Sequence, residues 1–379
     1  MNTRLFFFNS ESIDIDDGCF LRLALSNSGY LDLLSAVPPA ADVISTISSI
    51  YEELQEPLKS ICDLLLSGKT VCMEKLPEAL VESILKIRES GLIALRGNAV
   101  SLNNLYLQLV DGLLYFSELP HGRQTLYYGT DSYALACRLG TAPSRNNVLD
   151  CCAGPGIQGL LSASHGAHVT AVEVNPLASE LSLCNARLNK LDNLFNVINK
   201  SIIESETDLE NLRFDFICAN PRLLPIPFNL NYPFVGDGGT DGLSIFRQIM
   251  NYGIPHLSKN GKIVTLGLPG GSEVGPDIYC LAEQLQMKYQ MKFILTILSR
   301  VEITPRSLWI QYMADTINMY SLGENTVSCN EVFESYQNED ISFVYSYTLS
   351  AINNKCYGRD FTVIECDDKS QPLTQWWIS

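Results

Sequence analysis

One stretch decides the fold: Val148-Leu149-Asp150-Cys151-Cys152-Ala153-Gly154-Pro155-Gly156-Ile157-Gln158-Gly159. Its apolar start predicts a short β-strand that ends in the acid Asp150, and its glycines predict a tight turn into a helix. Because glycine has no Cβ, Gly154 and Gly156 let a ligand approach the backbone, and the helix N-terminus offers free N–H groups. The stretch therefore predicts a nucleoside-binding turn in an α/β protein.

Two later segments predict further strand ends at the same edge of the sheet. Residues 168–174 predict a second strand, and its acid, Glu173, follows Asp150 by 23 positions. In a doubly wound sheet this spacing places a carboxylate where it can accept hydrogen bonds from both ribose hydroxyls. A third strand, over residues 214–219, leads directly into Asn220-Pro221. We expect the three strand ends to line one crevice.

These residues in this order resemble the class I S-adenosylmethionine-dependent methyltransferases. Asn220-Pro221 is similar to the start of the Asn-Pro-Pro-Tyr signature of the branch that methylates amide nitrogens, including N5 of glutamine, or exocyclic amino nitrogens. A nicotinamide-binding Rossmann domain is the alternative, since residues 154–159 also fit G-x-G-x-x-G. The acid before the turn and the later Asn-Pro favour the methyltransferase.

The resemblance covers about residues 125–300 and implies an α/β fold, a Rossmann-like sheet of seven strands with helices on both faces. Predicted helices (241–257, 277–289) alternate with predicted strands (262–267, 292–298), which is typical of a parallel sheet. We interpret residues 301–340 as an insertion, and residues 342–349 and 361–364 as closing strands, the last one antiparallel. The catalytic domain is assigned to residues 121–379.

Residues 1–120 are interpreted as a separate domain. Apolar residues at three- and four-residue steps predict helices over 40–66 and 76–91, and strand pieces follow over 93–116. Helices followed by a hairpin are typical of a winged-helix-like module, which either binds DNA or serves as a lid or dimerisation domain. The few cations on the candidate helix favour a lid or a homodimer contact.

Composition limits the class of protein. The 379 residues leave room for two or three modules, and 46% hydrophobic with 18% charged residues indicate a globular chain. A net charge of −16 argues against nucleic acid as a partner. The sequence contains no run of about 20 apolar residues, so it predicts no membrane helix. Twelve scattered cysteines without a C-x-x-C pair and only four histidines predict a reduced, cytoplasmic protein without a metal site.

The resemblance implies S-adenosyl-L-methionine as cofactor and assigns residues to it. Asp150 is expected to organise the glycine turn, or to cap the following helix, and Glu173 to hold the ribose. Ser201 stands where the family often has an acid, so adenine recognition is expected to rest on backbone groups. The predicted cofactor-binding residues are Asp150, Ala153, Gly154, Gly156, Glu173, Val174, Ser201, Asn220 and Tyr127.

The acceptor side departs from the family pattern. Arg222 replaces the second proline of the signature and Leu223 replaces its aromatic residue. In the family the asparagine oxygen accepts a hydrogen bond from a planar nitrogen and the aromatic ring packs against that nitrogen. Tyr127 or Tyr128 could supply another platform, or simply pack at a domain junction. The predicted catalytic residues are Asn220, Tyr128 and Asp237.

Residues 224–242 predict an ordered loop over the crevice, rich in proline, glycine and aromatic residues. Asp237 contacts substrate or is structural, and Asp241 is expected to cap the next helix. Arg222 pairs either with a carboxylate of the substrate or with a surface acid. The predicted substrate-binding residues are Pro221, Arg222, Tyr232 and Phe234.

The leading hypothesis is methyl transfer to a small metabolite, for example in secondary metabolism. One alternative keeps the cofactor but transfers or cyclises its aminocarboxypropyl group, with release of methylthioadenosine. Others are a protein-glutamine or nucleic-acid amino methyltransferase, which the acidic charge and the missing aromatic residue disfavour, and a binding module without catalysis. The sequence leaves the acceptor, the attacked atom, the general base and the oligomeric state open.

Overall fold

The computed structural model describes residues 7–37, 42–120, 124–139, 146–321, 326–354, 360–366, 372–374 and 376. Parts of the predicted segments, including residues 40–41, the start of the catalytic domain at 121 and positions 322–325 of the insertion, lie outside these ranges. The chain divides into two compact units, residues 1–128 with 153–199, and residues 129–152 with 200–379. The predicted boundary near residue 120 stays a prediction.

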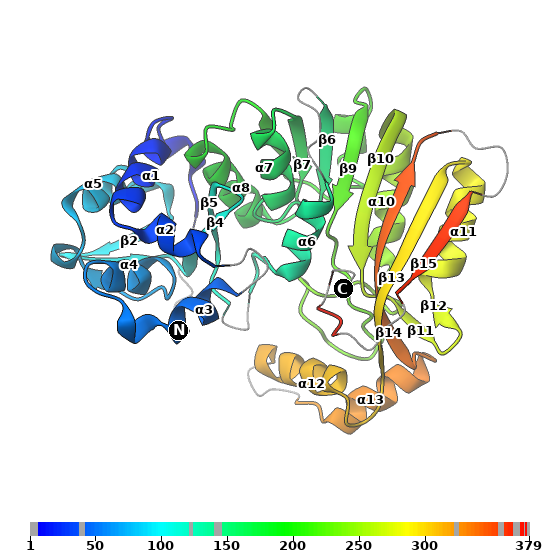
Figure 1. Ribbon diagram of the computed structural model, residues 1–379. Helices are drawn as coiled ribbons and strands as arrows, with labels where there is room; N and C mark the ends of the chain where they lie inside the picture. Colours follow the sequence, from blue (N-terminus) through cyan, green and yellow to red (C-terminus); the bar gives the residue numbers. More distant parts are fainter. Residues whose placement is uncertain are drawn as a thin grey trace. The chain divides into compact units, whose positions relative to one another are not determined.

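The first unit begins with helices and two small antiparallel sheets (Figure 1). The helices are α1 (Asp17–Asn27), α2 (Tyr30–Ser35), α3 (Val43–Ser49), α4 (Leu58–Leu65) and α5 (Glu78–Lys86). Strands β1 (Val71–Cys72), β3 (Ala99–Leu102) and β2 (Ile93–Arg96) form one sheet in this order, and β4 (Leu105–Val110) pairs with β5 (Leu113–Glu118). The winged-helix character of this region is not confirmed.

The first unit also contains a parallel pair of strands with their helices. Strands β7 (His168–Val172) and β8 (Phe195–Ile198) run parallel, and helices α7 (Ile157–Ser164) and α8 (Pro176–Leu188) belong to the same unit. Helix α8 starts where sequence chemistry predicts a start, because the Asn175 side chain accepts a hydrogen bond from the Leu177 N–H and a proline follows at the first helical position.

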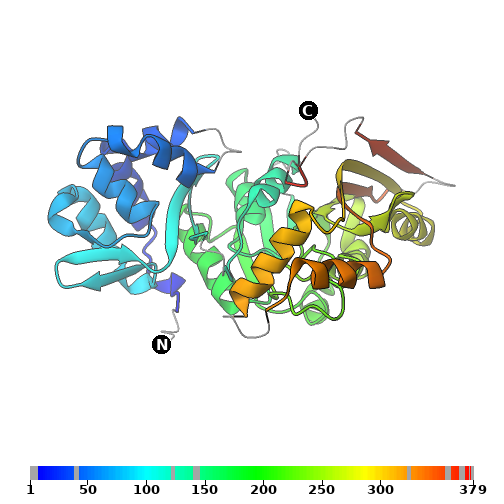
Figure 2. The same ribbon diagram turned by 90° about the horizontal axis from the view of Figure 1, so that it is seen from below.

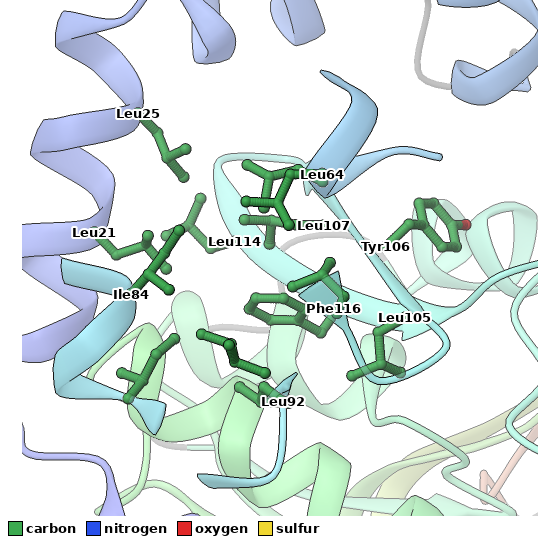
Figure 3. Close-up of a cluster of buried hydrophobic side chains, with 14 of the residues drawn as sticks. Leu21, Leu25, Leu64, Ile84, Leu92, Leu105, Tyr106, Leu107, Leu114 and Phe116 are labelled. Atoms are coloured by element: carbon green, nitrogen blue, oxygen red, sulfur yellow. The ribbon is translucent and has the colours of Figure 1, made fainter. Parts of the chain in front are cut away.

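The core of the first unit joins these two parts of the chain. Figure 3 shows Leu21 and Leu25 of α1 facing Leu107, Leu114 and Phe116 of the β4–β5 hairpin. The same cluster includes buried side chains of α8. Two asparagines bind the free edge of β5. Asn185 of α8 exchanges hydrogen bonds with the Phe116 backbone, and Asn189, the C-cap residue of α8, does so with the Leu114 backbone. These amides satisfy an edge that would otherwise expose unpaired N–H and C=O groups.

The second unit contains a mixed sheet with helices. Parallel strands β6 (Asn147–Cys151), β9 (Phe214–Ala219) and β10 (Leu257–Gly267) pair in this order. Strand β14 (Phe343–Ile352) lies between β10 and β13 (Lys292–Glu302), antiparallel to both. The short strand β11 (Gly270–Ser272) pairs antiparallel with the first residues of β14, and β12 (Gly275–Pro276) pairs antiparallel with β11. The predicted α/β character is confirmed, whereas the predicted count of seven strands is not.

The last strand corrects one expectation. Strand β15 (Phe361–Glu365) pairs with β13 in parallel, not antiparallel as the resemblance implied. The reason is the direction of the chain: β14 runs antiparallel to β13, and the chain reverses again before β15.

The helices of the second unit follow the predicted alternation. They are α6 (Thr130–Arg138), α9 (Glu206–Leu209), α10 (Ser244–Gly253), α11 (Ile278–Tyr289), α12 (Leu308–Tyr320) and α13 (Cys329–Asn338). Helices α12 and α13 contact each other and occupy the predicted insertion (Figures 1 and 2). In the part of the chain that the structure describes, no helix is long and apolar enough to span a membrane.

Candidate functional site

The glycine turn of the first unit follows β6 in sequence and opens helix α7. Gly154 has φ 55° and Gly156 has φ 95°, conformations that glycine adopts without strain. A Cβ on Gly156 would lie 2.9 Å from Ser182 Cβ, so this glycine permits close packing against α8. A Cβ on Gly154 would meet only the Tyr127 carbonyl oxygen, at 3.7 Å, among the described residues. The backbone at Gly154 is therefore the part of the turn that a ligand can approach.

Glu173 follows β7 and fixes the glycine turn through its carboxylate. This side chain is buried, its Oε2 accepts the Gly154 N–H at 2.7 Å, and its Oε1 accepts the Asn175 N–H at 2.7 Å. Its backbone carbonyl accepts Asn199 Nδ2 at 2.8 Å. Glu173 thus orders the turn itself, a role that the sequence reasoning did not assign to it.

The segment over residues 125–128 lies against this turn. The buried Glu118 carboxylate accepts the backbone N–H groups of Thr125 at 2.6 Å and Leu126 at 2.7 Å. Tyr127 is 43% exposed, and the half-buried Tyr128 ring packs 5.2 Å from the Tyr115 ring. The sequence reasoning missed Glu118, which stands within an apolar strand and gives no local signal.

Two predicted cofactor residues of the first unit carry no polar side chain. Ala153 is buried, and its N–H donates to the Val172 carbonyl at 3.2 Å. Val174 is 48% exposed and follows Glu173 directly.

In the second unit the strand register places two predicted residues at the same sheet edge. Asp150 on β6 pairs with Cys218 on β9, and Cys151 pairs with Ala219, the residue before Asn220. Asp150 is fully buried. Burial and the neighbouring Asp150 raise the pKa of the Cys218 thiol, which keeps this cysteine unreactive.

Asn220 is held by the first turn of helix α6. Its Nδ2 donates to Asp131 Oδ2 at 2.8 Å and to Ser132 Oγ at 3.2 Å. Its Oδ1 is buried and has no hydrogen-bond partner among the described residues. Buried polar atoms are nearly always hydrogen-bonded, so an unpaired carbonyl oxygen here is an acceptor available to a ligand.

Arg222 and Phe234 stack on each other in the loop that follows. The Arg222 guanidinium carbon lies 3.8 Å from the Phe234 ring centroid, and Nη1 donates to the Phe234 carbonyl at 3.3 Å. No carboxylate of the described residues forms an ion pair with Arg222. The surface ion pair considered for Arg222 is therefore not found among them, while Pro221, one residue earlier, is buried.

Backbone hydrogen bonds order this loop, as predicted. Leu224 and Gly238 lie on opposite sides of it: the Leu224 N–H donates to the Gly236 carbonyl, and the Gly238 N–H donates to the Leu224 carbonyl, both at 3.0 Å. The Asp237 Oδ1 accepts the Gly239 N–H at 2.9 Å, so its carboxylate also stabilises the loop.

Helix α13 holds the loop from outside. Asn229 Nδ2 donates to Ser335 Oγ at 2.8 Å, and the Tyr336 hydroxyl donates to the Pro225 carbonyl at 2.7 Å. Burial raises the pKa of the Tyr232 hydroxyl, and the neighbouring Tyr312 on α12 raises it further. Helix α13 therefore supports the loop over residues 224–242, which sequence reasoning did not predict.

Ser201 takes part in a local turn at the surface. Its hydroxyl donates to Glu204 Oε2 at 2.7 Å, and its N–H donates to the same oxygen at 3.0 Å. Within the described ranges, no group of three or more histidine, cysteine, aspartate or glutamate side chains could hold a metal ion.

Comparison with known proteins identifies the segment that contains these residues. The family model described as methyltransferase small domain matches residues 128–267. This segment is similar to the methyltransferase small domain. The match confirms the predicted resemblance to S-adenosylmethionine-dependent methyltransferases over these residues. The match agrees with the predicted transferase and with the predicted cofactor S-adenosylmethionine.

Two curated relatives match part of the chain. The ribosomal protein uL3 glutamine methyltransferase of Bradyrhizobium diazoefficiens is 29% identical over 127 residues, which are 31% of this chain and 39% of that protein. The release factor glutamine methyltransferase of Aquifex aeolicus is 33% identical over 101 residues, 24% of this chain and 35% of that protein. The chain thus spans less than half the length of these relatives.

The solved structures that match include the S-adenosylmethionine-dependent methyltransferase from Agrobacterium tumefaciens. That protein has a TM-score of 0.40 and 14% identity, and the match covers 68% of this chain and 72% of the other.

Proposed function

We propose that this protein is an S-adenosylmethionine-dependent N-methyltransferase whose acceptor is a small molecule with an N–H group and a carboxylate. The observation that carries the proposal is the buried Asn220 Oδ1, which has no hydrogen-bond partner among the described residues. An oxygen in this position accepts a hydrogen bond from the nitrogen to be methylated and thereby orients its lone pair.

The residues of the first unit fit the cofactor. Gly154 leaves space at its backbone, and we assign the Glu173 carboxylate, which holds the turn, to the ribose hydroxyls. We assign Ala153, Gly156 and Val174 to the same binding segment. From the second unit we assign Asp150 and Ser201. S-adenosylmethionine supplies a methyl group bonded to a sulfonium, and the chain supplies binding and alignment.

For the reaction itself, the chain has to hold the acceptor nitrogen in line with the methyl group. We assign this task to Asn220, which also stays a predicted cofactor contact. The nitrogen loses its proton to solvent. Tyr127, by its exposure, and Tyr128 remain the candidates for the aromatic platform that Leu223 does not provide, and Asp237 remains the candidate for a polar contact to substrate.

The acceptor carboxylate is assigned to Arg222. Its guanidinium is oriented by the Phe234 ring and carbonyl, which leaves further N–H donors for an anion. A planar fork of donors matches a carboxylate in two parallel hydrogen bonds. Phe234 is 62% exposed, and with the buried Pro221 and the mostly buried Tyr232 it would form the apolar part of the pocket.

A second candidate function is methylation of a protein glutamine. The names of both relatives support it, because each describes a glutamine methyltransferase. The altered residues Arg222 and Leu223 and the short matched segments weigh against a simple transfer of that activity.

One experiment tests these assignments together. The purified chain is incubated with S-adenosylmethionine alone, with amides and amines that carry a carboxylate, with their methyl esters, and with glutamine-containing peptides, and the products are identified by mass spectrometry. S-adenosylhomocysteine together with an N-methylated carboxylate compound is expected. A methylated peptide would favour the protein substrate, and methylthioadenosine would mean that the aminocarboxypropyl group is transferred or cyclised. Neither nucleoside with any acceptor would contradict the proposal.

A further inference from the structure

We propose that Asp131 and Ser132 are positioning residues that hold the Asn220 amide with its oxygen toward the acceptor. This inference rests on the proposed function, because it explains how the acceptor-binding oxygen is presented. Asp131 and Ser132 lie in the first turn of α6, 89 and 88 positions before Asn220 in the chain. Both side chains are 4% exposed.

The two ends of an asparagine amide have nearly the same shape but opposite hydrogen-bonding roles. One end donates through Nδ2 and the other accepts through Oδ1. A rotation of the Asn220 amide by half a turn would therefore keep the packing but turn its N–H groups toward the nitrogen to be methylated. That nitrogen is itself a hydrogen-bond donor, so the rotated amide could not form a hydrogen bond with it.

The Asp131 carboxylate selects one of these two orientations. An ionised carboxylate only accepts hydrogen bonds, so the end of Asn220 that faces Asp131 Oδ2, 2.8 Å away, has to be the Nδ2 group. The rotated amide would place its oxygen against the carboxylate, and two acceptors in a buried environment repel each other. Oδ1 consequently points away from Asp131.

Ser132 adds a second contact that is itself anchored. Its Oγ accepts Asn220 Nδ2 at 3.2 Å and also the Gly129 N–H at 3.3 Å. The hydroxyl oxygen thus connects the start of α6 to the side chain after β9. A hydroxyl can also donate, so Ser132 fixes the position of the amide while Asp131 fixes its orientation.

The arrangement leaves Oδ1 buried without a partner among the described residues, which is unfavourable for the free protein. A hydrogen bond from the acceptor N–H relieves this cost. The cost is sustained because Asp131 blocks the orientation that would remove it.

The test is an exchange of the two side chains. In Asn220→Asp, two buried carboxylates face each other, and the acceptor kcat/KM is expected to fall about 100-fold. In Asp131→Asn, either amide orientation is allowed, and kcat/KM is expected to fall about tenfold. In the double exchange, the new amide at 131 donates to the new carboxylate at 220, whose second oxygen again faces the acceptor. The double variant should exceed Asn220→Asp at least tenfold in acceptor kcat/KM.

A purely structural role predicts a different pattern. The effects of the two single changes would then add, and cofactor affinity and melting temperature would fall with activity; that outcome would overturn the inference. Under the inference, cofactor affinity by calorimetry stays within about twofold in Asp131→Asn. Asp215→Asn, near the other end of β9 and bonded to Ser258, is the matched control and should leave acceptor kinetics unchanged.

Failure of the proposed function can be told apart from failure of this inference. If the native protein methylates no N–H acceptor, the function is wrong, and the pair is then judged by thermal unfolding alone. A melting temperature that falls in each single variant and recovers in the double exchange supports the positioning role, and additive losses overturn it. If Asn220→Asp does not fold, recovery of a folded protein in the double exchange decides the same question.

Discussion

The glycine turn and the loop over residues 224–242, called the acceptor loop after its proposed role, are built in different ways. The turn is fixed by contacts that are close in sequence: Gly154 and Glu173 are 19 positions apart, and Asn175 is bound two positions after Glu173. The acceptor loop depends on side chains far along the chain, such as the Tyr336 hydroxyl on the Pro225 carbonyl, 111 positions away. The Glu173 carboxylate fixes the turn within one segment of the chain, whereas the loop is held by side chains distant in sequence. A substitution in one region is therefore expected to leave the other region unchanged.

The largest expected effect separates the two regions directly. Asn220→Ala removes the oriented oxygen, and we expect kcat/KM for the acceptor to fall about 10²–10³-fold, as for other groups that align charge or protons in a transition state. Calorimetry should show cofactor affinity within a few-fold of the native value. Ser258→Ala, at the start of β10, serves as control. An equal loss of cofactor affinity would mean that Asn220 binds the cofactor, and the two regions would then not have separate roles.

The glycine turn can be divided by a matched pair of substitutions. Gly156→Ala places a Cβ 2.9 Å from Ser182 Cβ at φ 95°, so both overpacking and backbone strain act, and we expect a loss of about 2–3 kcal/mol in unfolding free energy. Gly154→Ala meets no atom closer than 3.7 Å, so strain alone should cost about 1 kcal/mol. Urea unfolding measures both.

For cofactor affinity, the order of the losses in the same two variants should be the reverse of the order for unfolding free energy. Gly154 offers the approachable backbone, so Gly154→Ala should weaken cofactor affinity more than Gly156→Ala, measured by calorimetry at a temperature where both variants are folded. Losses of stability and affinity in the same order would mean that the turn is one packed unit and that Gly154 has no separate role.

Arg222 tests whether the acceptor loop recognises charge. Arg222→Met keeps an extended apolar side chain against Phe234 but removes the guanidinium, and we expect kcat/KM for a carboxylate acceptor to fall about tenfold to 100-fold. The methyl ester of the same acceptor should show little difference between native and variant protein. If both acceptors lose equally, Arg222 supports the loop and does not bind an anion.

The features that could be predicted from the sequence are those built by neighbouring residues. The turn, Glu173 and Asn220 are found from local patterns, because consecutive residues carry their geometry. The two asparagine amides that bind β5 could not be predicted, since they act on backbone groups 69 and 75 positions away. Glu118 acts only seven positions away, but its partner is a backbone N–H group, and no sequence pattern marks such a contact. The direction of β15 was wrong for a related reason: nothing in its own residues encodes which edge it joins.

The smallest expected effect concerns Asp241, at the end of the acceptor loop. Its carboxylate accepts the Leu243 N–H at 3.0 Å and binds Arg247 through both oxygens. The predicted cap by Asp241 is not found, because α10 begins at Ser244 with Leu243 as its N-cap and without a side-chain cap. Burial opposes ionisation of Asp241, but the hydrogen bonds from Arg247 and Leu243 outweigh it and lower its pKa. This stabilisation is therefore present above the ordinary aspartate range near pH 4 and is lost as pH falls through the lowered pKa.

Arg247→Met should consequently reduce unfolding free energy by about 1 kcal/mol at pH 7, since the pair is only partly buried. The difference from native protein should shrink as the pH falls below about 4, because protonation of Asp241 removes the same ion pair in both. Arg213→Met, an exposed arginine whose side chain binds backbone carbonyls, should show no such pH dependence. A constant difference at every pH would mean that Arg247 stabilises the protein through the packing of α10. The end of the loop would then be held by local contacts, as the glycine turn is, and not by side chains distant in sequence, as the beginning of the loop is.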